Sequence, residues 1–443
     1  MTSTAKATVA EAITRVHREE WARVVAVLTR RFGDLGIAED MAAEAFAVAV
    51  ERWPTDGVPP NPGAWITTTA NRRAIDRLRR ESRRDDKHKE AQMLYDRRPA
   101  EPLDVVGDMT LDDDRLRLIF TCCHPALAME ARIALTLRMV GGLTVSEIAR
   151  AFLVPETTMG QRITRAKGKI KAARIPYRVP SADDLPARIS GVLTVLFLVF
   201  NEGYLASDPE QEPLRSDLTL EAIRLTRLLR ALLPSDGEVT GLLAQMLLIE
   251  ARRPARVSAS GELVTLDEQD RGAWDTALIA EGHALVRQRI AAVSAGQGRP
   301  GRYQILAAIN AVHTSARDVG DTDWSQVVAL YDQLARIDPS PIVGLNRAIA
   351  LAELDGPEVA LAVIDALDRS TGSAQRPSTG SAHRLDGYHA YHATRADLLR
   401  RLGRSADART AYGRAIELAG NTAEVAYLTR RRDQLGPAEK IDG

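Results

Sequence analysis

The sequence predicts an all-α fold in which two small helical domains precede a longer helical C-terminal region. Ala, Leu and Arg dominate the composition and aromatic residues make up only 5%, which favours helices over sheets. Apolar residues recur at helical spacing in long segments, and a loose repeat of about 34 residues follows residue 300. With 443 residues, 45% of them hydrophobic, the chain can form roughly three domains of ~150 residues.

Three helices are predicted in the first domain, residues 1–95. The first spans residues 9–33 and ends at glycines. The second spans residues 38–53, with Val50 on its inward apolar face. A loop rich in Pro and Gly follows at residues 53–63, where a helix cannot continue. The third helix, residues 64–84, has an apolar stripe, and its other faces are rich in arginine.

Charge is distributed unevenly along a chain whose formal net charge is zero. Residues 71–98 hold 11 Lys/Arg against 6 Asp/Glu, and residues 143–178 hold 8 against 2. Between these two basic segments lies an acidic connector, predicted as a linker over residues 96–112. Two basic modules joined by an acidic segment indicate two surfaces that bind nucleic acid.

A second domain is predicted over residues 113–178, with helices near 113–121 and 130–140. A helix-turn-helix then follows at residues 143–171. Thr144 and Glu147 have the spacing of a capping box at the start of its first helix, and Thr157 or Thr158 is expected to cap the second. The second helix has a buried stripe of Met159, Ile163, Ala166 and Ile170.

The opposite face of that second helix is strongly basic. It carries Gln161, Arg162, Arg165, Lys167, Lys169 and Lys171. Gln and Arg can make bidentate hydrogen bonds to base edges, and Lys can contact phosphates, so this helix is predicted to enter a major groove. The alternative is a solvated basic face on an ordinary helical hairpin.

After residue 178 the chain is predicted to form a helical extension over residues 185–300 and helical repeats over residues 301–436. Alternating apolar and polar residues at 255–270 suggest one small β-hairpin within the extension. The repeats resemble tetratricopeptide (TPR) repeats. Their helix pairs are expected at 303–317 with 324–340, 342–354 with 357–367, and 388–402 with 405–421.

Two blocks of the N-terminal half resemble bacterial extracytoplasmic-function (ECF) sigma factors. The first is IAEDMAAEAFAVAVERW (37–53) followed by PGAWITTTANRRAIDRLRRE (62–81), and the second is LTVSEIARAFLVPETTMGQRITRAKGKI (143–170). TCCHPAL (121–127) and the helical tail resemble a subclass with a repeat-containing extension. The turn glycine usual in the second block is Leu153 here.

The resemblance implies a role for each segment. Residues 1–95 would be the region-2 domain that binds the polymerase clamp and melts the −10 element, and residues 113–178 the region-4 domain that binds the −35 element. The −35 contacts expected are Thr157, Thr158, Gln161, Arg162, Arg165 and Lys169; the −10 contacts are Asn71, Arg72, Arg73, Arg77 and Arg80; the polymerase contacts are Asp40, Glu44 and Glu51. The partners implied are core RNA polymerase (its β and β′ subunits), promoter DNA and a regulatory protein on the extension.

Other functions have little support in the sequence. We expect no enzyme and no cofactor, because the sequence has no Walker motif, catalytic triad or pair of catalytic acids. We expect no metal, because the Cys122-Cys123-His124 cluster lacks the four spaced ligands of a structural zinc site. The absence of a signal segment and of a long apolar run predicts a cytoplasmic protein that does not enter the membrane. The main alternative to a sigma factor is a stand-alone helix-turn-helix regulator with a TPR-like sensor domain.

Overall fold

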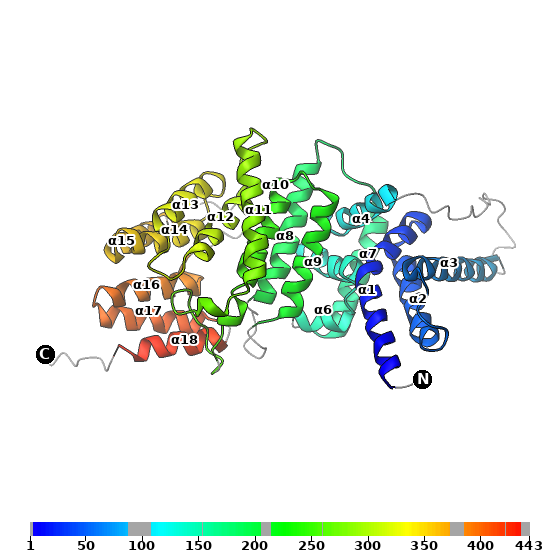
Figure 1. Ribbon diagram of the computed structural model, residues 1–443, viewed down its shortest axis with the longest axis horizontal. Helices are drawn as coiled ribbons and strands as arrows, with labels where there is room; N and C mark the ends of the chain where they lie inside the picture. The colour runs from blue at the N-terminus through cyan, green and yellow to red at the C-terminus, as the bar shows by residue number, and fades with distance from the viewer. Residues whose placement is uncertain are drawn as a thin grey trace. The chain divides into compact units, whose positions relative to one another are not determined.

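The computed structural model describes residues 3–86, 108–152, 154–204, 214–258, 260–372, 385–420 and 422–435. The described chain is helical almost throughout, and no strand is assigned in these ranges (Figure 1). The chain divides into two compact units, Met1–Leu198 and Val199–Gly443. The predicted all-α class is therefore confirmed.

The first unit begins with three long helices: α1 (Ser3–Phe32), α2 (Leu35–Asp56) and α3 (Pro62–Asp86). Asp34 caps α2, and its carboxylate accepts hydrogen bonds from the amides of Gly36 (2.8 Å) and Ile37 (3.2 Å). Each of these helices packs against the other two. The prediction for Val50 is wrong, because this side chain is 56% exposed.

The loop predicted to begin at residue 53 begins later, because α2 continues through Pro54 to Asp56. Pro54 lies in the last turn of the helix, so the hydrogen bond lost with its missing N–H falls at the end of the helix and not in its interior. Trp53, which is only 1% exposed, anchors this turn in the core.

A second group of short helices completes the region around the helix-turn-helix. It comprises α4 (Asp108–Cys122), α5 (Met129–Leu135), the π-helical turn η1 (Thr136–Gly141), α6 (Val145–Ala151) and α7 (Glu156–Ala172). Residues 108–112, predicted as linker, thus belong to α4, and the rest of the predicted linker lies outside the described residues. Helix α1 packs against both α4 and η1, so the two predicted domains lie within one compact unit.

Gly142 ends η1 and sets the direction in which the chain enters α6. Its φ of 77° is left-handed, a conformation that favours glycine. A Cβ at this position would lie 3.0 Å from the Trp21 ring and 3.0 Å from His17. Glycine is therefore needed both for the turn and for the close approach to α1.

Helix α8 (Leu185–Tyr204) carries the chain out of the first unit. It is the one helix among the described residues that is long and apolar enough to cross a membrane, judged by length and composition alone. Its residues Val192, Val195, Leu196 and Phe200 are nevertheless buried in the protein.

The second unit continues with α9 (Ser216–Leu232), α10 (Gly237–Glu250) and α11 (Thr276–Ser294). Within the predicted hairpin, only an isolated antiparallel bridge between Val257 and Leu263 is seen in the described residues. The predicted hairpin is therefore wrong in its length, since this one bridge replaces two paired strands. The chain turns tightly at Gly261, whose φ is 83°, and the Leu263 amide then donates to the Ala423 carbonyl.

Seven further helices follow, each packing on the next: α12 (Arg302–Ser315), α13 (Trp324–Ile337), α14 (Pro341–Leu354), α15 (Pro357–Gly372), α16 (His389–Arg401), α17 (Ser405–Leu418) and α18 (Thr422–Asp433). Six of them match the predicted repeat pairs. Small buried residues such as Ala348, Ala408 and Ala415 allow the paired helices to approach closely. Two apolar clusters, one from α12 to α15 and one from α14 to α18, form their core.

Candidate nucleic-acid interface

The first helix of the helix-turn-helix, α6, begins with the predicted capping box. Thr144 Oγ1 accepts the Glu147 amide at 3.1 Å, and the Glu147 carboxylate accepts the Thr144 amide at 2.7 Å, which completes the capping box. Ile148 and Ala149 are buried on the inward face of α6. The predicted cap of α7 is wrong, since Pro155 is the N-cap and no side chain caps this helix.

Helix α7 has a buried side and an open side. Met159, Ile163, Ala166 and Ile170 are between 1% and 9% exposed, so the predicted stripe is confirmed. The predicted −35 contacts Thr157, Thr158, Gln161, Arg165 and Lys169 are exposed, whereas Arg162 is half-buried. Gln161 and Arg165 lie one turn apart, with Arg165 Nη2 3.4 Å from Gln161 Oε1.

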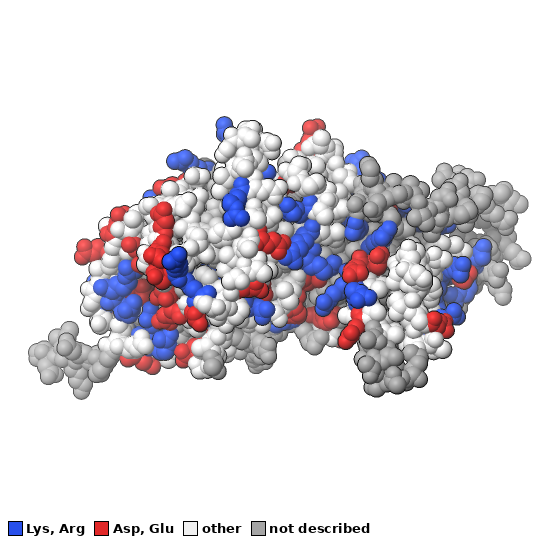
Figure 2. Space-filling view, viewed as in Figure 1, with Lys and Arg blue, Asp and Glu red and all other residues white. Residues whose placement is uncertain are grey.

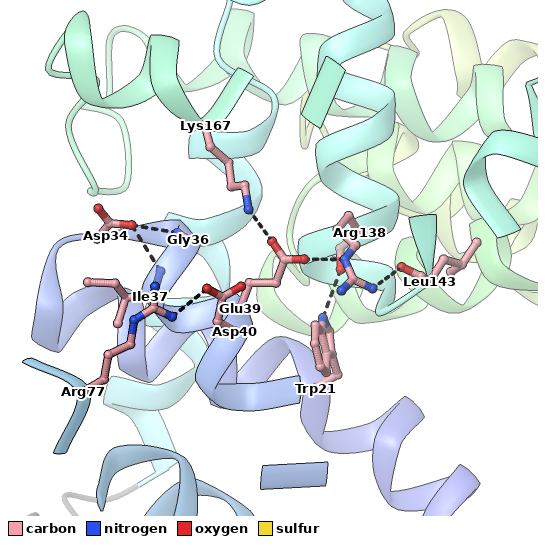
Figure 3. A network of polar contacts seen from close by, with 10 residues as sticks. All are labelled: Trp21, Asp34, Gly36, Ile37, Glu39, Asp40, Arg77, Arg138, Leu143 and Lys167. Atoms are coloured by element: carbon pink, nitrogen blue, oxygen red, sulfur yellow. Dashed lines mark hydrogen bonds and ion pairs between the residues drawn. The ribbon is translucent and has the colours of Figure 1, made fainter. Parts of the chain in front are cut away.

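Lys167 does not belong to this open face. Its Nζ lies 2.7 Å from Glu39 Oε2, and Arg138 Nε lies 2.6 Å from Glu39 Oε1 (Figure 3). The Glu39 side chain is only 9% exposed. One buried carboxylate on α2 thus binds two cations, one from η1 and one from α7. We call Glu39, Arg138 and Lys167 the Glu39 cluster.

Two further contacts hold the helix-turn-helix against α1 and α2. Trp21 Nε1 donates to the Arg138 carbonyl at 3.0 Å, while the Arg138 guanidinium lies 5.5 Å from the centre of the Trp21 ring. Lys171 Nζ lies 3.1 Å from Asp34 Oδ2. Burial opposes ionisation of Asp34, but hydrogen bonds from Lys171, Ile37 and Gly36 outweigh this effect and lower its pKa.

Glu39 and Arg138 were not identified from the sequence. A signal was available, because Glu39 follows Leu35 by four residues and precedes Ala42 and Phe46 by three and seven. It therefore lies on the buried stripe of α2. An acid on an apolar stripe indicates a buried cationic partner, although the sequence does not say which one.

The predicted −10 arginines lie along α3. Arg72 and Arg80 are exposed. Arg73 Nη1 lies 2.9 Å from Glu44, and Arg77 Nη1 lies 2.8 Å from Asp40. The predicted polymerase acids Asp40 and Glu44 therefore pair with the predicted strand-binding arginines, while Glu51 is exposed further along α2.

The remaining −10 candidate, Asn71, is half-buried at the start of this arginine series. Its Oδ1 is buried and forms no hydrogen bond within the described part of the chain. Nearby in sequence, Asn61 Oδ1 accepts the Ala64 amide at 3.0 Å and so begins α3. Trp53 and Trp65 meet edge to face across the loop, with ring centres 5.5 Å apart.

The two adjacent cysteines lie in the protein core. Cys122 and Cys123 are buried free thiols, and Cys123 Sγ lies 3.3 Å from Thr136 Oγ1. Burial raises the pKa of both thiols, that of Cys123 to about 11. No group of three metal-ligating side chains occurs in the described ranges.

Three known families match segments of this chain. Models of sigma-70 region 2 and sigma-70 region 4 match residues 18–84 and 117–170. A family of unknown function (DUF6596) matches residues 188–290. No solved structure matches the chain.

Similar whole proteins agree with these matches. An uncharacterized protein of Rhizobium meliloti (strain 1021) is 42% identical over 414 residues, which cover 93% of each chain. The probable ECF RNA polymerase sigma factor SigI of Mycobacterium tuberculosis is 28% identical over 197 residues, covering 43% of this chain and 66% of SigI. The ECF RNA polymerase sigma factor SigK of Mycobacterium bovis is 30% identical over 149 residues, covering 32% of this chain and 75% of SigK.

A stand-alone regulator would need the helix-turn-helix but not a region-2 domain, and this chain has both. The exposed face of α7 and the arginines of α3 fall within the matched region-4 and region-2 segments. The chain therefore belongs to the ECF sigma factors, which bind core RNA polymerase and direct transcription initiation at promoters, and it carries a C-terminal helical extension.

Proposed function

We propose that residues 113–178 bind the −35 element through the exposed face of α7. The observation that carries this assignment is the division of α7 into a buried stripe and an open face with Gln161, Arg165 and Lys169. Gln161 and Arg165 have the donors and acceptors for base edges. Thr157, Thr158 and Lys169 would hold phosphates, and Arg162, being half-buried, would contact DNA at the edge of this face.

Residues 1–95 would melt the −10 element along α3. Arg72 and Arg80 are exposed and available to phosphates of the displaced strand. Asn71, with its buried unpartnered oxygen, lies on α3 six residues after Trp65 and would contact an unstacked base. Extruding a base costs a few kcal/mol, which these contacts would offset.

Polymerase binding and strand binding would share charges. Asp40 and Glu44 are paired with Arg77 and Arg73 in the free protein. A basic clamp surface that takes the two carboxylates would release the two guanidinium groups for DNA. Exposed ion pairs of this kind contribute only about 0.2–1 kcal/mol each, so this exchange is energetically small.

The first unit would also have to open. In the free protein Lys171 of α7 and Arg77 of α3 contact Asp34 and Asp40, which are six residues apart in the chain, or about 9 Å along a helix. The −10 and −35 elements are about 25 base pairs apart, which is about 85 Å of duplex. Both surfaces can contact their elements together only when α7 has left α2.

The C-terminal extension would regulate this process through a partner, and the chain would act as a cytoplasmic specificity subunit with no catalytic centre of its own. Run-off transcription with purified core polymerase on a genomic fragment library tests the function. The full chain should direct synthesis from defined start sites, and deletion of residues after 180 should change promoter activity strongly in one direction. Equal activity of the truncated and full chains would refute the regulatory role.

A further inference from the structure

A half-open cavity of about 610 Å³ lies in the second unit, lined by helices α12 to α14 and α16 to α18 and by the segment 265–271. Its size is in the range of sites that bind small molecules, about 300–1,000 Å³. Its wall is largely apolar and includes Trp324, Tyr331 and Val327. None of the residues assigned above to promoter recognition or polymerase binding lines this cavity.

Several polar atoms in the cavity wall are buried and unpaired within the described part of the chain. Thr322 Oγ1, His313 Nδ1 and Tyr412 Oη each lack a hydrogen-bond partner. Thr322 is 5% exposed and Tyr412 is 1% exposed. Buried hydroxyls are normally hydrogen-bonded, because leaving one unpaired costs free energy. A ligand with acceptor atoms would satisfy these groups.

One end of the cavity is also positively charged without a matching acid in contact. Arg271 lines this end and donates to the carbonyls of His313 at 2.7 Å and Ala316 at 2.8 Å. Behind it, Arg252 is 9% exposed and donates to Asn310 Oδ1 at 3.0 Å. Neither arginine forms an ion pair with a carboxylate of the described residues. The charges of Asp318 and Asp321 favour the ionised form of Arg271 without forming an ion pair with it.

The other arginines of the cavity wall are paired with acids. Arg400 and Arg401 are paired with Asp397 and Glu353, and Arg431 contacts Glu268. Acidic and basic side chains are likewise intermixed on the visible face of α13 to α18 (Figure 2). Burial, followed by the charges of Arg252 and Arg271, lowers the pKa of His313 to about 4, so this imidazole is neutral at pH 7. Of the arginines that line the cavity, Arg271 is thus the one that forms no ion pair within the described residues.

We propose that this cavity binds a small organic anion, a carboxylate with an apolar body. The carboxylate lies against Arg271 and accepts from Thr322, while the apolar body extends along Trp324 and Tyr331 toward Tyr412. The extension is then a sensor domain for a metabolite acid, a property separate from promoter recognition.

A matched pair of probes tests both parts of the proposal. Octanoate and octan-1-ol have the same apolar chain and differ in the carboxylate. Titration calorimetry with the full-length protein should show saturable binding of one octanoate per chain, and octan-1-ol should bind at least about tenfold more weakly because a charged hydrogen bond is lost. No polymerase or DNA is present, so the result is independent of the sigma function.

Two variants locate the site. Thr322→Val keeps the shape of the side chain and removes a hydroxyl that has no protein partner, so it should weaken octanoate binding about tenfold without lowering the melting temperature. Arg271→Gln should weaken binding at least as much. Arg336→Gln is the matched control, because Arg336 is an exposed arginine of α13 outside the cavity wall.

Three results would overturn the proposal. One is the absence of saturable octanoate binding at millimolar concentration. Another is equal affinity for octanoate and octan-1-ol, which would show a purely apolar site. The third is unchanged binding in Thr322→Val, since this variant retains the fold even where Arg271→Gln does not.

Discussion

Replacing Glu39 by Gln removes the negative charge that, among the described residues, joins α2 to both η1 and α7. Arg138 and Lys167 would then remain only 15% and 21% exposed without a carboxylate partner. Removing one member of a buried ion pair costs about 3–5 kcal/mol. Gln keeps one hydrogen-bond acceptor, and Arg138 keeps its bond to the Leu143 carbonyl at 2.8 Å. We therefore expect the free energy of unfolding of the first unit to fall by about 2–3 kcal/mol.

Asp40→Asn is the matched control, because Asp40 is the next residue of the same helix. Its ion pair with Arg77 has a similar distance, 2.8 Å, but its side chain is 49% exposed. Such a surface pair contributes only about 0.2–1 kcal/mol. The two variants should therefore differ in their loss of unfolding free energy, because Glu39 is buried and Asp40 is exposed while the ion-pair distances are similar.

Urea unfolding, followed by hydrogen exchange of peptides from α5 to α7, measures the loss in the first unit. A double-mutant cycle of Glu39→Gln with Lys167→Met should give a coupling energy of about 1–2 kcal/mol. If Glu39→Gln and Asp40→Asn destabilise the unit equally, or if the cycle is additive, the Glu39 cluster does not hold the helix-turn-helix in place.

Three other predictions concern the turn, the DNA-binding face and pH. Gly142→Ala should destabilise the first unit by at least about 1–2 kcal/mol, because φ is 77° and the new Cβ would lie 3.0 Å from Trp21. Gly168 of α7 has open space around it, so Gly168→Ala should instead stabilise the first unit by about 0.5–1 kcal/mol. Equal urea midpoints for the two variants would contradict this prediction. Gln161→Ala and Arg165→Ala should each reduce discrimination at one −35 base by about 1–3 kcal/mol, whereas Lys169→Ala should weaken binding to all sequences alike. Equal losses on random DNA in a binding assay would exclude base recognition. His313 has a pKa of about 4 in the folded protein against an ordinary 6.5, so the unfolded chain takes up more protons on acidification, and the second unit should lose about 2 kcal/mol between pH 7 and pH 5. The His313→Gln variant should show a flatter pH profile of stability, and an unchanged slope would assign the effect elsewhere.

Local sequence was sufficient for most of the secondary structure. The Thr144–Glu147 capping box, the buried stripe of α7 and the six repeat helices depend on contacts between residues a few positions apart. Two of the wrong predictions concern helix ends, where local sequence preferences were overridden by tertiary packing. Pro54 stays helical because Trp53 is buried, and α7 begins at Glu156 after Pro155, an N-cap residue without a side-chain hydrogen bond. The residue types for DNA contact were also visible, since an exposed basic face follows from the position of the apolar stripe.

The sequence by itself determined an all-α sigma factor with two basic modules and a repeat-containing extension. The tertiary structure alone decided which charges meet: Glu39 pairs with Arg138 and Lys167, 99 and 128 residues away, and Arg77 pairs with Asp40. It alone also decided that Arg271 lines a cavity with Arg252 behind it, and that neither arginine forms an ion pair within the described residues. Helical periodicity and capping are short-range effects, whereas the partner of a buried charge depends on how distant helices pack.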